Sequence, residues 1–422
     1  MMVKARLQRH SVCNFSLFPS RFSHKKFSKS YRKNIKICVN RLEIYLNFRF
    51  IWLNFAFEIS RSRKPLHIYI HVPFCTSKCP YCAFGSFSDK FNLVKSYFRA
   101  LELEVRDFLT KNPHAQISTL FIGGGTPSAV DAGLYDEIFA LLAPRFAAKA
   151  EISSEANPNS ASPAWLRAMQ GLGVNRISFG AQSFNDAKLK FLGRAHSAAQ
   201  IFLAVQNAKA AGFDNINLDL IYASKFDDKR NLKFEMAEFV RCEVPHLSAY
   251  ALSLEKNTPF FGRESFKKES AALAKFLFAL AADSGFSQYE ISNFAARGLR
   301  CKHNLAYWRG EDYAGFGAFA VGTSGRVRLS SPKNLRDYIA DPLQKQREAL
   351  SVQDKKLERI FLGLRCVLGF EAQILNAAEL SNAQLLVRAK KLKFSEGKFY
   401  NPNFLLADEI ALFITQSSRD GR

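Results

Sequence analysis

The sequence lacks several features that would assign it at once to a class of protein. Its strongly apolar stretch, residues 42–57, is interrupted by Asn47, Arg49 and Asn54, and it falls short of the roughly 20 residues that a membrane-spanning helix needs. We expect no secretory signal peptide, because no small-residue cleavage site lies near the start. The chain has eight cysteines, widely spaced except for one group of three, which does not fit a disulfide framework. We therefore expect a protein of the reducing cytoplasm.

Acidic residues are scarce in the first 64 positions. These positions hold 15 of the 60 Lys and Arg residues but only two of the 37 acidic residues, so they carry much of the net charge of +23. The remainder is only mildly basic, and we expect no nucleic-acid partner. Methionine is also missing between Met2 and Met169. We interpret residues 1–64 as a basic extension ahead of a true start near Leu66, in preference to a transit peptide or a segment that attaches peripherally to a membrane.

From residue 66 onward, strand and helix patterns alternate. Strands are expected at 66–72, 118–124, 150–156, 174–180, 215–222 and 246–252, and helices at 92–110, 133–143, 163–170, 198–211, 230–241 and 269–284. Six βα units in a row imply an α/β fold with a parallel sheet and outer helices. Six units are fewer than the eight of a closed TIM barrel, so we predict an open, three-quarter barrel with its functional side chains at the C-terminal ends of the strands.

The last part of the chain has a different pattern. Helices are expected at 333–340, 352–364, 371–378 and 381–390, and a hairpin is expected to turn at Glu396-Gly397 before a closing helix in LLADEIALFI. We predict a small α+β domain that resembles a winged helix and, lacking a dense Lys/Arg helix, serves as a lid or partner surface. The predicted division is an extension at 1–64, a barrel at 65–292, a connecting segment at 293–330 and a C-terminal domain at 331–422.

Three cysteines follow the first predicted strand in the run HVPFCTSKCPYC, as Cys75, Cys79 and Cys82. Thiolates at these spacings lie close enough to hold a single iron–sulfur cluster. Three ligands instead of four leave one iron open, just as catalytic metal sites keep one position free. The alternative is a structural zinc site that takes His71 as its fourth ligand.

Glycine and polar residues follow the later strands. The second strand ends in GGGTP, and the others are followed by single polar candidates, namely Glu155, Gln182, Arg194 and Asp219. Glycines allow a ligand to approach the backbone, an Arg can pair with a carboxylate, and carboxylates and amides can bond ribose hydroxyls. Each residue alone would be interpreted as an ordinary surface or capping residue, but together they suit a zwitterionic nucleoside.

The cysteine run, with Tyr81 inside it, resembles the signature of the radical S-adenosylmethionine (SAM) superfamily. The phrases YIHVPFCTSKCPYCAF, FIGGGTPS, SEANP, RISFGAQSF, LGRAH, LDLIY, HLSAY and YEISNFA are similar to the coproporphyrinogen III dehydrogenase group of that superfamily, over residues 66 to about 420. The resemblance implies a 4Fe–4S cluster on Cys75, Cys79 and Cys82, and SAM held by Tyr69, Gly124, Gly125, Thr126, Glu155, Gln182, Arg194 and Asp219. It also implies a reductant such as flavodoxin or ferredoxin, and one-electron cleavage of SAM to a 5′-deoxyadenosyl radical if the site is active.

Two branches of this group differ at sites that the sequence shows. The porphyrin-decarboxylating branch carries a further Cys two residues after the third ligand, where this chain has Phe84, and the heme-chaperone branch instead carries HNxxYW, which begins here at His303. The resemblance therefore implies a heme chaperone, with a homodimer among its assemblies, that delivers heme to apo-hemoproteins of the respiratory chain. We expect coproporphyrinogen oxidase activity to be absent. The alternative is an oxygen-independent coproporphyrinogen III oxidase of porphyrin biosynthesis.

The resemblance makes His303 a candidate axial heme ligand, with Cys301 as a rival. Without the resemblance, the residues favour a histidine packed beside core aromatics. Two segments also depart from the group. Its Gly-Leu-Pro-Gly turn after LDLIY is replaced by residues 223–227, ASKFD, and its Pro-Gly-Ala-His-Ser type run past DYAGFG is replaced by residues 318–321, AFAV. The second departure lies near the expected porphyrin region.

Overall fold

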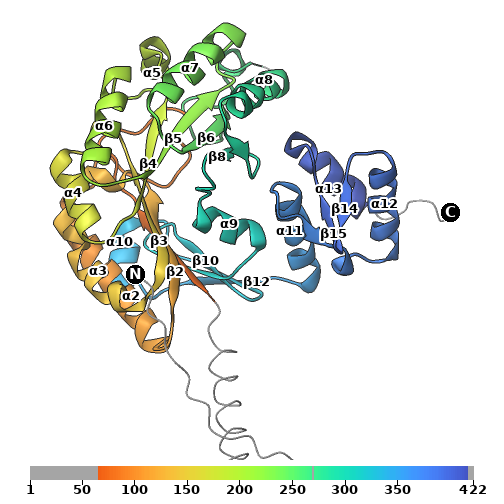
Figure 1. Ribbon diagram of the computed structural model, residues 1–422. Helices are drawn as coiled ribbons and strands as arrows, with labels where there is room; N and C mark the ends of the chain where they lie inside the picture. The colour runs from red at the N-terminus through yellow and green to blue at the C-terminus, as the bar shows by residue number, and fades with distance from the viewer. Residues whose placement is uncertain (1–64, 269, 417–422) are drawn as a thin grey trace, which may run out of the picture. The chain divides into compact units, whose positions relative to one another are not determined.

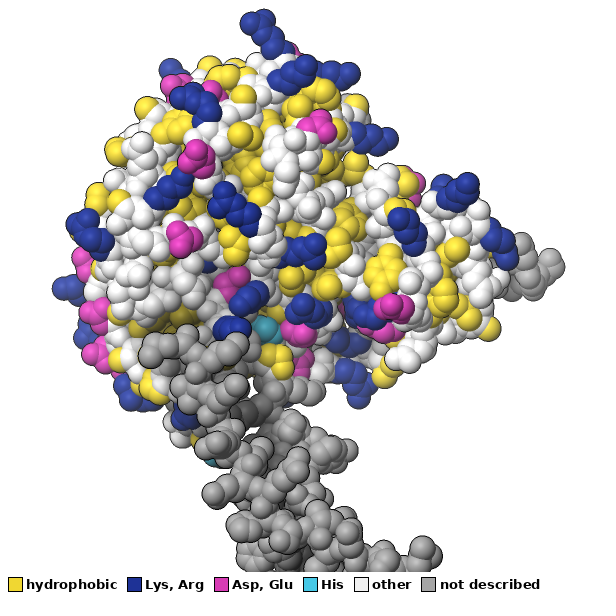
Figure 2. All heavy atoms as spheres, viewed as in Figure 1, with side chains coloured by type: hydrophobic (Ala, Val, Ile, Leu, Met, Phe, Trp, Pro, Cys, Tyr) yellow, Lys and Arg dark blue, Asp and Glu magenta, His cyan; other side chains and the backbone are white. Residues whose placement is uncertain are grey.

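The computed structural model describes residues 65–268 and 270–416. The predicted N-terminal extension, residues 1–64, lies outside this part of the chain. None of the described helices is long and apolar enough to cross a membrane. On the face shown in Figure 2, Lys and Arg side chains are scattered among acidic and apolar ones and do not gather in one place.

A parallel sheet forms the centre of the fold. Its strands are β1 (Leu66–Val72), β2 (Ile117–Gly124), β3 (Phe146–Ala156), β4 (Arg176–Gln182), β5 (Asn215–Tyr222) and β6 (His246–Ala251). Each strand pairs in parallel with the next one along the chain. Along β1 the apolar residues Ile68, Ile70 and Val72 are fully buried and alternate with polar His67, Tyr69 and His71, so the sheet has one apolar and one polar face. The predicted α/β architecture is confirmed.

Helices connect these strands and cover one face of the sheet (Figure 1). They are α2 (Val94–Lys111), α3 (Asp136–Leu142), α4 (Pro163–Gly171), α5 (Asp186–Phe191), α6 (Ala198–Ala210), α7 (Lys229–Arg241) and α8 (Ser270–Asp283). Local sequence sets several helix starts: Ser162 accepts a hydrogen bond from the Trp165 amide ahead of Pro163, and Asp228 accepts one from the Asn231 amide. The short helix α5 was not expected from the sequence.

Further strands extend the sheet at both edges. At one edge β8 (Asn293–Ala295) pairs antiparallel with β6 and with β7 (Ser287–Gln288). At the other edge β9 (Tyr313–Phe316) pairs in parallel with β1 and is followed by β10 (Val321–Ser324), β11 (Val327–Ser330) and β12 (Gln346–Ala349). Between the two additions, α9 (Lys302–Arg309) contacts β2. The sequence patterns had predicted none of β7 to β12.

A second hydrophobic core lies in the last part of the chain. It is built from α11 (Val352–Leu364), β13 (Phe370–Glu371), α12 (Ala377–Arg388), β15 (Lys398–Tyr400) and α13 (Ala407–Thr415). The exposed strand β14 (Lys393–Ser395) pairs with β15 at the edge of this core. The preceding α10 (Leu335–Ala340) packs on α2. The expected boundary at residue 331 stays a prediction. Short 3-10 turns occur at Phe91–Leu93, Pro127–Ala129, Ala132–Tyr135, Ala143–Arg145, Glu264–Phe266, Ala372–Ile374 and Phe404–Leu406.

Two local details of this second part differ in how well the sequence anticipated them. The helix expected at 381–390 is present as α12, which starts earlier, at Ala377, because Asn376 and Glu379 form a capping box there. The helix expected at 371–378 is wrong for most of its length, since Glu371 belongs to β13 and Ala372–Ile374 form a 3-10 turn. The expected hairpin is present as β14 and β15. Glu396 and Gly397 both have positive φ, 50° and 74°, as a two-residue hairpin turn requires.

The turn after β5, where the chain departs from the group pattern, holds a buried charge cluster. Ala223 takes a left-handed φ of 62°, a conformation that glycine adopts more readily. Asp227, with no exposed surface, accepts hydrogen bonds from the Ser224 amide and hydroxyl at 2.8 and 2.7 Å. The Lys188 ammonium lies 2.7 Å from Asp227 and 3.3 Å from Glu235, and all three side chains are buried. Lys188 therefore ties α5 to the turn and to α7.

We predict that Lys188→Met lowers the free energy of unfolding by about 3–5 kcal/mol, because two carboxylates would be left buried without their cation. Urea unfolding measures the change. Lys190→Met, at an exposed position on the same helix, is the matched control and should stay within about 0.5 kcal/mol of the wild type. Equal effects of the two substitutions would contradict the role of the buried cluster.

Candidate functional site

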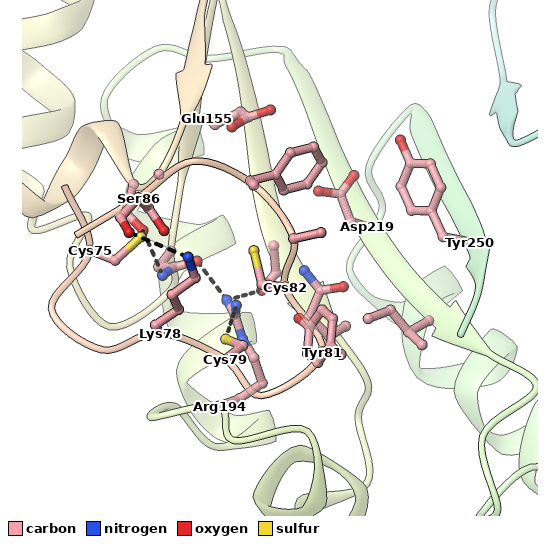
Figure 3. A pocket seen from close by; sticks show the side chains of 18 of the residues that line it. Cys75, Lys78, Cys79, Tyr81, Cys82, Ser86, Glu155, Arg194, Asp219 and Tyr250 are labelled. Carbon is pink, nitrogen blue, oxygen red and sulfur yellow. Dashed lines mark hydrogen bonds between the residues drawn. The ribbon is translucent and has the colours of Figure 1, made fainter. Parts of the chain in front are cut away.

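A cavity of about 490 Å³ opens at the C-terminal ends of the parallel strands. The predicted residues that line it are Cys75, Cys79, Cys82, Gly124, Gly125, Thr126, Glu155, Gln182, Arg194 and Asp219. They come from the loops or ends of five different strands, and Figure 3 shows many of them converging on one space. Tyr69 and His303 are not among the lining residues. The structure therefore brings all but these two candidates together.

The cysteine loop is fixed at both of its ends. The Cys75 amide donates to the Phe87 carbonyl at 3.1 Å, and the Phe87 amide donates to the Pro73 carbonyl at 2.8 Å. All three cysteines are free thiols of intermediate exposure, and burial raises the pKa of Cys82. Within residues 65–268 and 270–416, no set of three or more His, Cys, Asp or Glu side chains is already arranged as a metal site, so the three sulfur atoms share one cavity without forming a closed ligand set.

Two side chains from other strands donate hydrogen bonds to the cysteine sulfurs. The Thr126 hydroxyl lies 3.4 Å from Cys75 Sγ, and Arg194 Nη1 lies 3.4 Å from Cys79 Sγ. Donors of this kind stabilise thiolates and tune the potential of a cluster that thiolates hold. The loop is thus prepared for charged sulfur ligands.

The glycine loop after β2 lies against the cysteine loop. The Gly125 amide donates to Val72 O at 2.9 Å, and the Thr126 amide donates to Phe74 O at 2.8 Å. A Cβ at Gly125 would lie only 2.8 Å from both carbonyl oxygens, and Gly124 has a φ of 109°. Glycine is therefore required at both positions, because the backbone approaches closely at one and is left-handed at the other.

Two carboxylates face the cavity next to this loop. Glu155 accepts a hydrogen bond from the Gly124 amide at 3.1 Å, and Asp219 accepts one from Asn217 at 2.7 Å. Burial raises the pKa of Glu155 to about 7, and the charge of nearby Asp219 adds to the shift. Burial also raises the pKa of Asp219. A ligand with hydroxyl or amino donors would satisfy both groups.

Arg194 is held so that part of its guanidinium faces the cavity. Its Nη2 donates to Asn157 Oδ1 at 2.5 Å and to Gly180 O at 2.7 Å. Its Nε is buried without a hydrogen-bond partner, so one donor is left for a ligand. Gln182 has a φ of 67° and lines the same cavity. Sequence reasoning missed Asn157, although it lies inside the quoted SEANP phrase.

Tyr69 and His71 support the cysteine loop from the inner face of β1. His71 Nε2 donates to Gly85 O at 2.7 Å, so the other ring nitrogen, Nδ1, accepts from the Tyr69 hydroxyl at 2.9 Å. Burial lowers the pKa of His71 to about 4, which keeps the ring neutral. Both ring nitrogens are thus engaged, which does not favour His71 as the fourth ligand of a zinc site.

The two candidate heme ligands lie elsewhere, at α9. The His303 side chain is fully buried, with Nδ1 2.7 Å from Thr119 Oγ1 and Nε2 2.8 Å from the Tyr307 hydroxyl. Burial lowers its pKa to about 3. Cys301 is also fully buried, and burial raises its pKa to about 12. Neither residue presents an open ligand atom in this conformation.

Comparison with known proteins identifies the family. Residues 69–232 match the Radical SAM superfamily. The heme chaperones HemW of Lactococcus lactis and Bacillus subtilis are 33% and 34% identical to this chain, over 72% and 71% of it and 82% and 83% of their own lengths. HemW of Escherichia coli is 34% identical, over 70% of this chain and 81% of its own. The chain belongs to the HemW family. Membership confirms the resemblance drawn from the motifs.

The fold also matches a solved structure of the wider group. Coproporphyrinogen III oxidase (HemN) from Escherichia coli, a radical SAM enzyme, aligns with a TM-score of 0.71 and 22% identity, over 83% of this chain and 90% of its own. At this identity the match shows the fold alone. Phe84, the position at which the resemblance separates the two branches, lies at the cavity with 70% of its surface exposed.

Membership of the radical SAM superfamily implies a 4Fe–4S cluster and SAM, and the residues fit both groups. Three free thiols lie on one loop, and two of them, Cys75 and Cys79, receive hydrogen bonds from Thr126 and Arg194, as cluster ligands do. The orphaned Arg194 Nε suits a carboxylate, while the glycine loop and Glu155 suit an amino group and hydroxyls. No described residue supplies a fourth thiol at the cavity.

We predict that Cys75→Ala, Cys79→Ala and Cys82→Ala each abolish cluster loading, because no other thiol lines the cavity. Iron and sulfide content, with the absorbance of the thiolate-to-iron band, measure this in anaerobically reconstituted protein. Cys242→Ala, at a buried thiol outside the site, should load fully. Full iron in any of the first three variants would disprove the ligand assignment.

We predict that Glu155→Gln flattens part of the dependence of stability on pH. Because burial raises the folded-state pKa of Glu155 from 4.5 to about 7, its contribution to stability is fully present below pH 4.5 and is lost as the pH rises through 7. The loss amounts to about 3 kcal/mol. Urea unfolding of wild type and variant between pH 4.5 and 8.5 measures it as the difference between two curves. Parallel curves would contradict the shift.

Proposed function

We propose that this protein is a cytoplasmic heme chaperone that binds heme and passes it to apo-hemoproteins of the respiratory chain, with a 4Fe–4S cluster on Cys75, Cys79 and Cys82 and with SAM beside it. The observation that carries the proposal is Phe84: the chain is about one third identical to proteins named heme chaperone, and at this position it has no thiol. Phe84 stands where the decarboxylating branch, by the resemblance, carries a further cysteine, so its presence favours the chaperone branch.

Different cavity residues would hold the cluster and SAM. The chemistry that a reduced cluster supplies when bound is the transfer of one electron to SAM. Arg194 offers its Nε to the SAM carboxylate, and the glycine loop allows the amino-acid end to approach the backbone. Glu155 and Asp219 accept from hydroxyl and amino donors, and deprotonation of Glu155 near pH 7 strengthens it as an acceptor. We propose flavodoxin or ferredoxin as the electron donor.

The mouth of the cavity has features that suit a flat, anionic tetrapyrrole. Phe84 presents an aromatic face to solvent, and such faces stack on extended ring systems. Lys78 lines the same cavity at an exposed position, where its ammonium can pair with a propionate. These features support heme as cargo without naming an iron ligand.

A second candidate function is oxygen-independent coproporphyrinogen III oxidation. The close fold match to HemN over 90% of that chain favours it, because the cavity occupies the same architecture. An oxidase would convert coproporphyrinogen to protoporphyrinogen, whereas a chaperone would bind heme and leave it unchanged, so a direct assay separates the two functions.

We predict that the anaerobically reconstituted protein shows a saturable Soret shift on heme titration and forms no protoporphyrinogen from coproporphyrinogen with SAM and reductant present. Heme has an aromatic platform and a cation at the cavity mouth, whereas the decarboxylating thiol is replaced by Phe84. Authentic HemN assayed in parallel is the positive control. Conversion of coproporphyrinogen at an enzymatic rate would overturn the chaperone assignment.

A further inference from the structure

Helix α9, which contains the HNxxYW motif, is anchored to β3 by a buried carboxylate. Glu151, only 4% exposed, accepts hydrogen bonds from the amides of Lys302 and His303, both at 3.0 Å. These are orphan donors of the first helical turn, and a negative charge is favourable there. The Cys301 thiol also donates to Glu151, at 3.4 Å. The start of the helix is therefore bonded into the inside of the sheet.

Side chains tie the same helix to β1 and β2. Thr119 Oγ1 on β2 lies 2.7 Å from His303 Nδ1 and 2.8 Å from His67 Nδ1 on β1. His67 Nε2 in turn lies 2.8 Å from Glu311 just past the end of α9. Glu151, Thr119 and His67 are thus the contacts of one helix with three neighbouring strands. Of these strands, β1 leads into the cysteine loop, β2 ends in the glycine loop and β3 carries Glu155.

The direction of these hydrogen bonds follows from the carboxylate at one end. Glu311 favours the protonated nitrogen of His67 at Nε2, so His67 Nδ1 accepts the Thr119 hydroxyl proton. Thr119 Oγ1 then accepts from His303 Nδ1–H, which leaves the lone pair of His303 on Nε2. The Tyr307 hydroxyl donates to that nitrogen at 2.8 Å. The one nitrogen of His303 able to bind iron is therefore already occupied.

A line of packed rings joins His303 to the cysteine loop. Its ring stacks on Phe121 with centroids 5.3 Å apart, and Phe121 stacks on Tyr69 at 6.3 Å. The Tyr69 hydroxyl bonds to His71, which bonds to Gly85 O, three residues past Cys82. Any displacement of His303 would therefore open a gap behind the residues that hold the cysteine loop in place.

We propose that His303 is a positioning residue that fixes α9 against β1, β2 and β3 and so supports the cluster and SAM site, and that heme iron takes no ligand from it. The inference deepens the proposed function, on which only its heme arm rests. It gives the HNxxYW motif a role in supporting the cluster and SAM site, in place of a role in binding heme.

Tyr307→Phe is the sharpest test for the heme arm. The variant removes one oxygen atom and frees His303 Nε2 without disturbing the ring stack. If His303 is a positioning residue, heme affinity and the Soret spectrum stay within about twofold of the wild type, while the buried nitrogen left unpaired lowers stability by a measurable shift in Tm. A heme affinity raised tenfold or more, or a change in spin state, would show that His303 does ligate iron and would overturn the proposal.

His303→Gln tests the positioning arm. Its matched control is Phe213→Leu, a buried substitution that destabilises the core without touching this network. In the anaerobically reconstituted full chain, His303→Gln should weaken SAM binding by about 3- to 30-fold and alter the SAM-induced change in the cluster's electron paramagnetic resonance signal. Phe213→Leu should leave both unchanged. Equal SAM affinity and equal spectra in the two variants would overturn the positioning role.

The two arms separate this inference from the proposed function. If the wild type binds no heme, the chaperone proposal fails, yet the SAM and resonance measurements still decide the role of His303. Should His303→Gln fail to fold, Thr119→Val supplies the SAM and resonance measurements, since it removes the hydroxyl that joins His303 to β2 and to His67. Normal SAM binding and an unaltered resonance signal in a destabilised Thr119→Val protein would then overturn the positioning role.

Discussion

The rest of the structure depends on one constraint: the inner face of the parallel sheet is polar, and every polar group on it has to be either bonded or turned into the ligand cavity. Toward the N-terminal ends of the strands, α9 supplies the bonds for β1 to β3 through Glu151, Thr119 and His67. For β5 and β6, His246 bonds to Asn217 and Tyr289 in the same way. At the C-terminal ends, Arg194 Nε is among the buried polar atoms of the described residues that have no protein partner, and Arg194 lines the cavity. The cavity is where the internal network of hydrogen bonds stops.

The sequence predicted the parts of this fold that local pattern controls. Apolar and polar residues alternate along β1, and strand and helix patterns alternate along the chain, so the six βα units and their order could be predicted from the sequence. The three cysteines could be identified because their spacing on one loop lets them hold a single cluster. The edge strands β7 to β12 were not, because they are short and owe their pairing to neighbours far along the chain. The helix expected at 371–378 was wrong because the capping box of Asn376 and Glu379 starts α12 only at Ala377, after a short strand and a 3-10 turn.

The environment of His303 shows why a motif does not predict its own role. Its partners Thr119 and Glu151 lie 184 and 152 positions away in the chain, and nothing in the HNxxYW run indicates which of them it will meet. The interpretation from residues alone, a histidine beside core aromatics, agrees with the ring stack on Phe121. The departure from the group pattern at residues 318–321 also depends on a distant part of the chain. Phe319 adopts a φ of 66°, and its ring lies where a Cβ on Gly85 would fall. In both cases, contacts with residues far along the chain set the role of the side chain, and the local sequence does not predict them.

The division of the inner face also bears on how one chain can hold a redox cluster and carry heme. Strands β1, β2 and β3 each bear a cavity group at one end and an α9 contact at the other, so drawing a ligand out of α9 would loosen the frame that positions Cys75, Gly124 and Glu155. A cargo site built on exposed residues such as Phe84 makes no such demand, because Phe84 has 70% of its surface free and supports nothing beneath it. Under the proposed function, heme would arrive and leave while the buried network stays intact. The fold that this chain shares with HemN can thus keep its buried frame while the residues at the rim of the cavity vary with function.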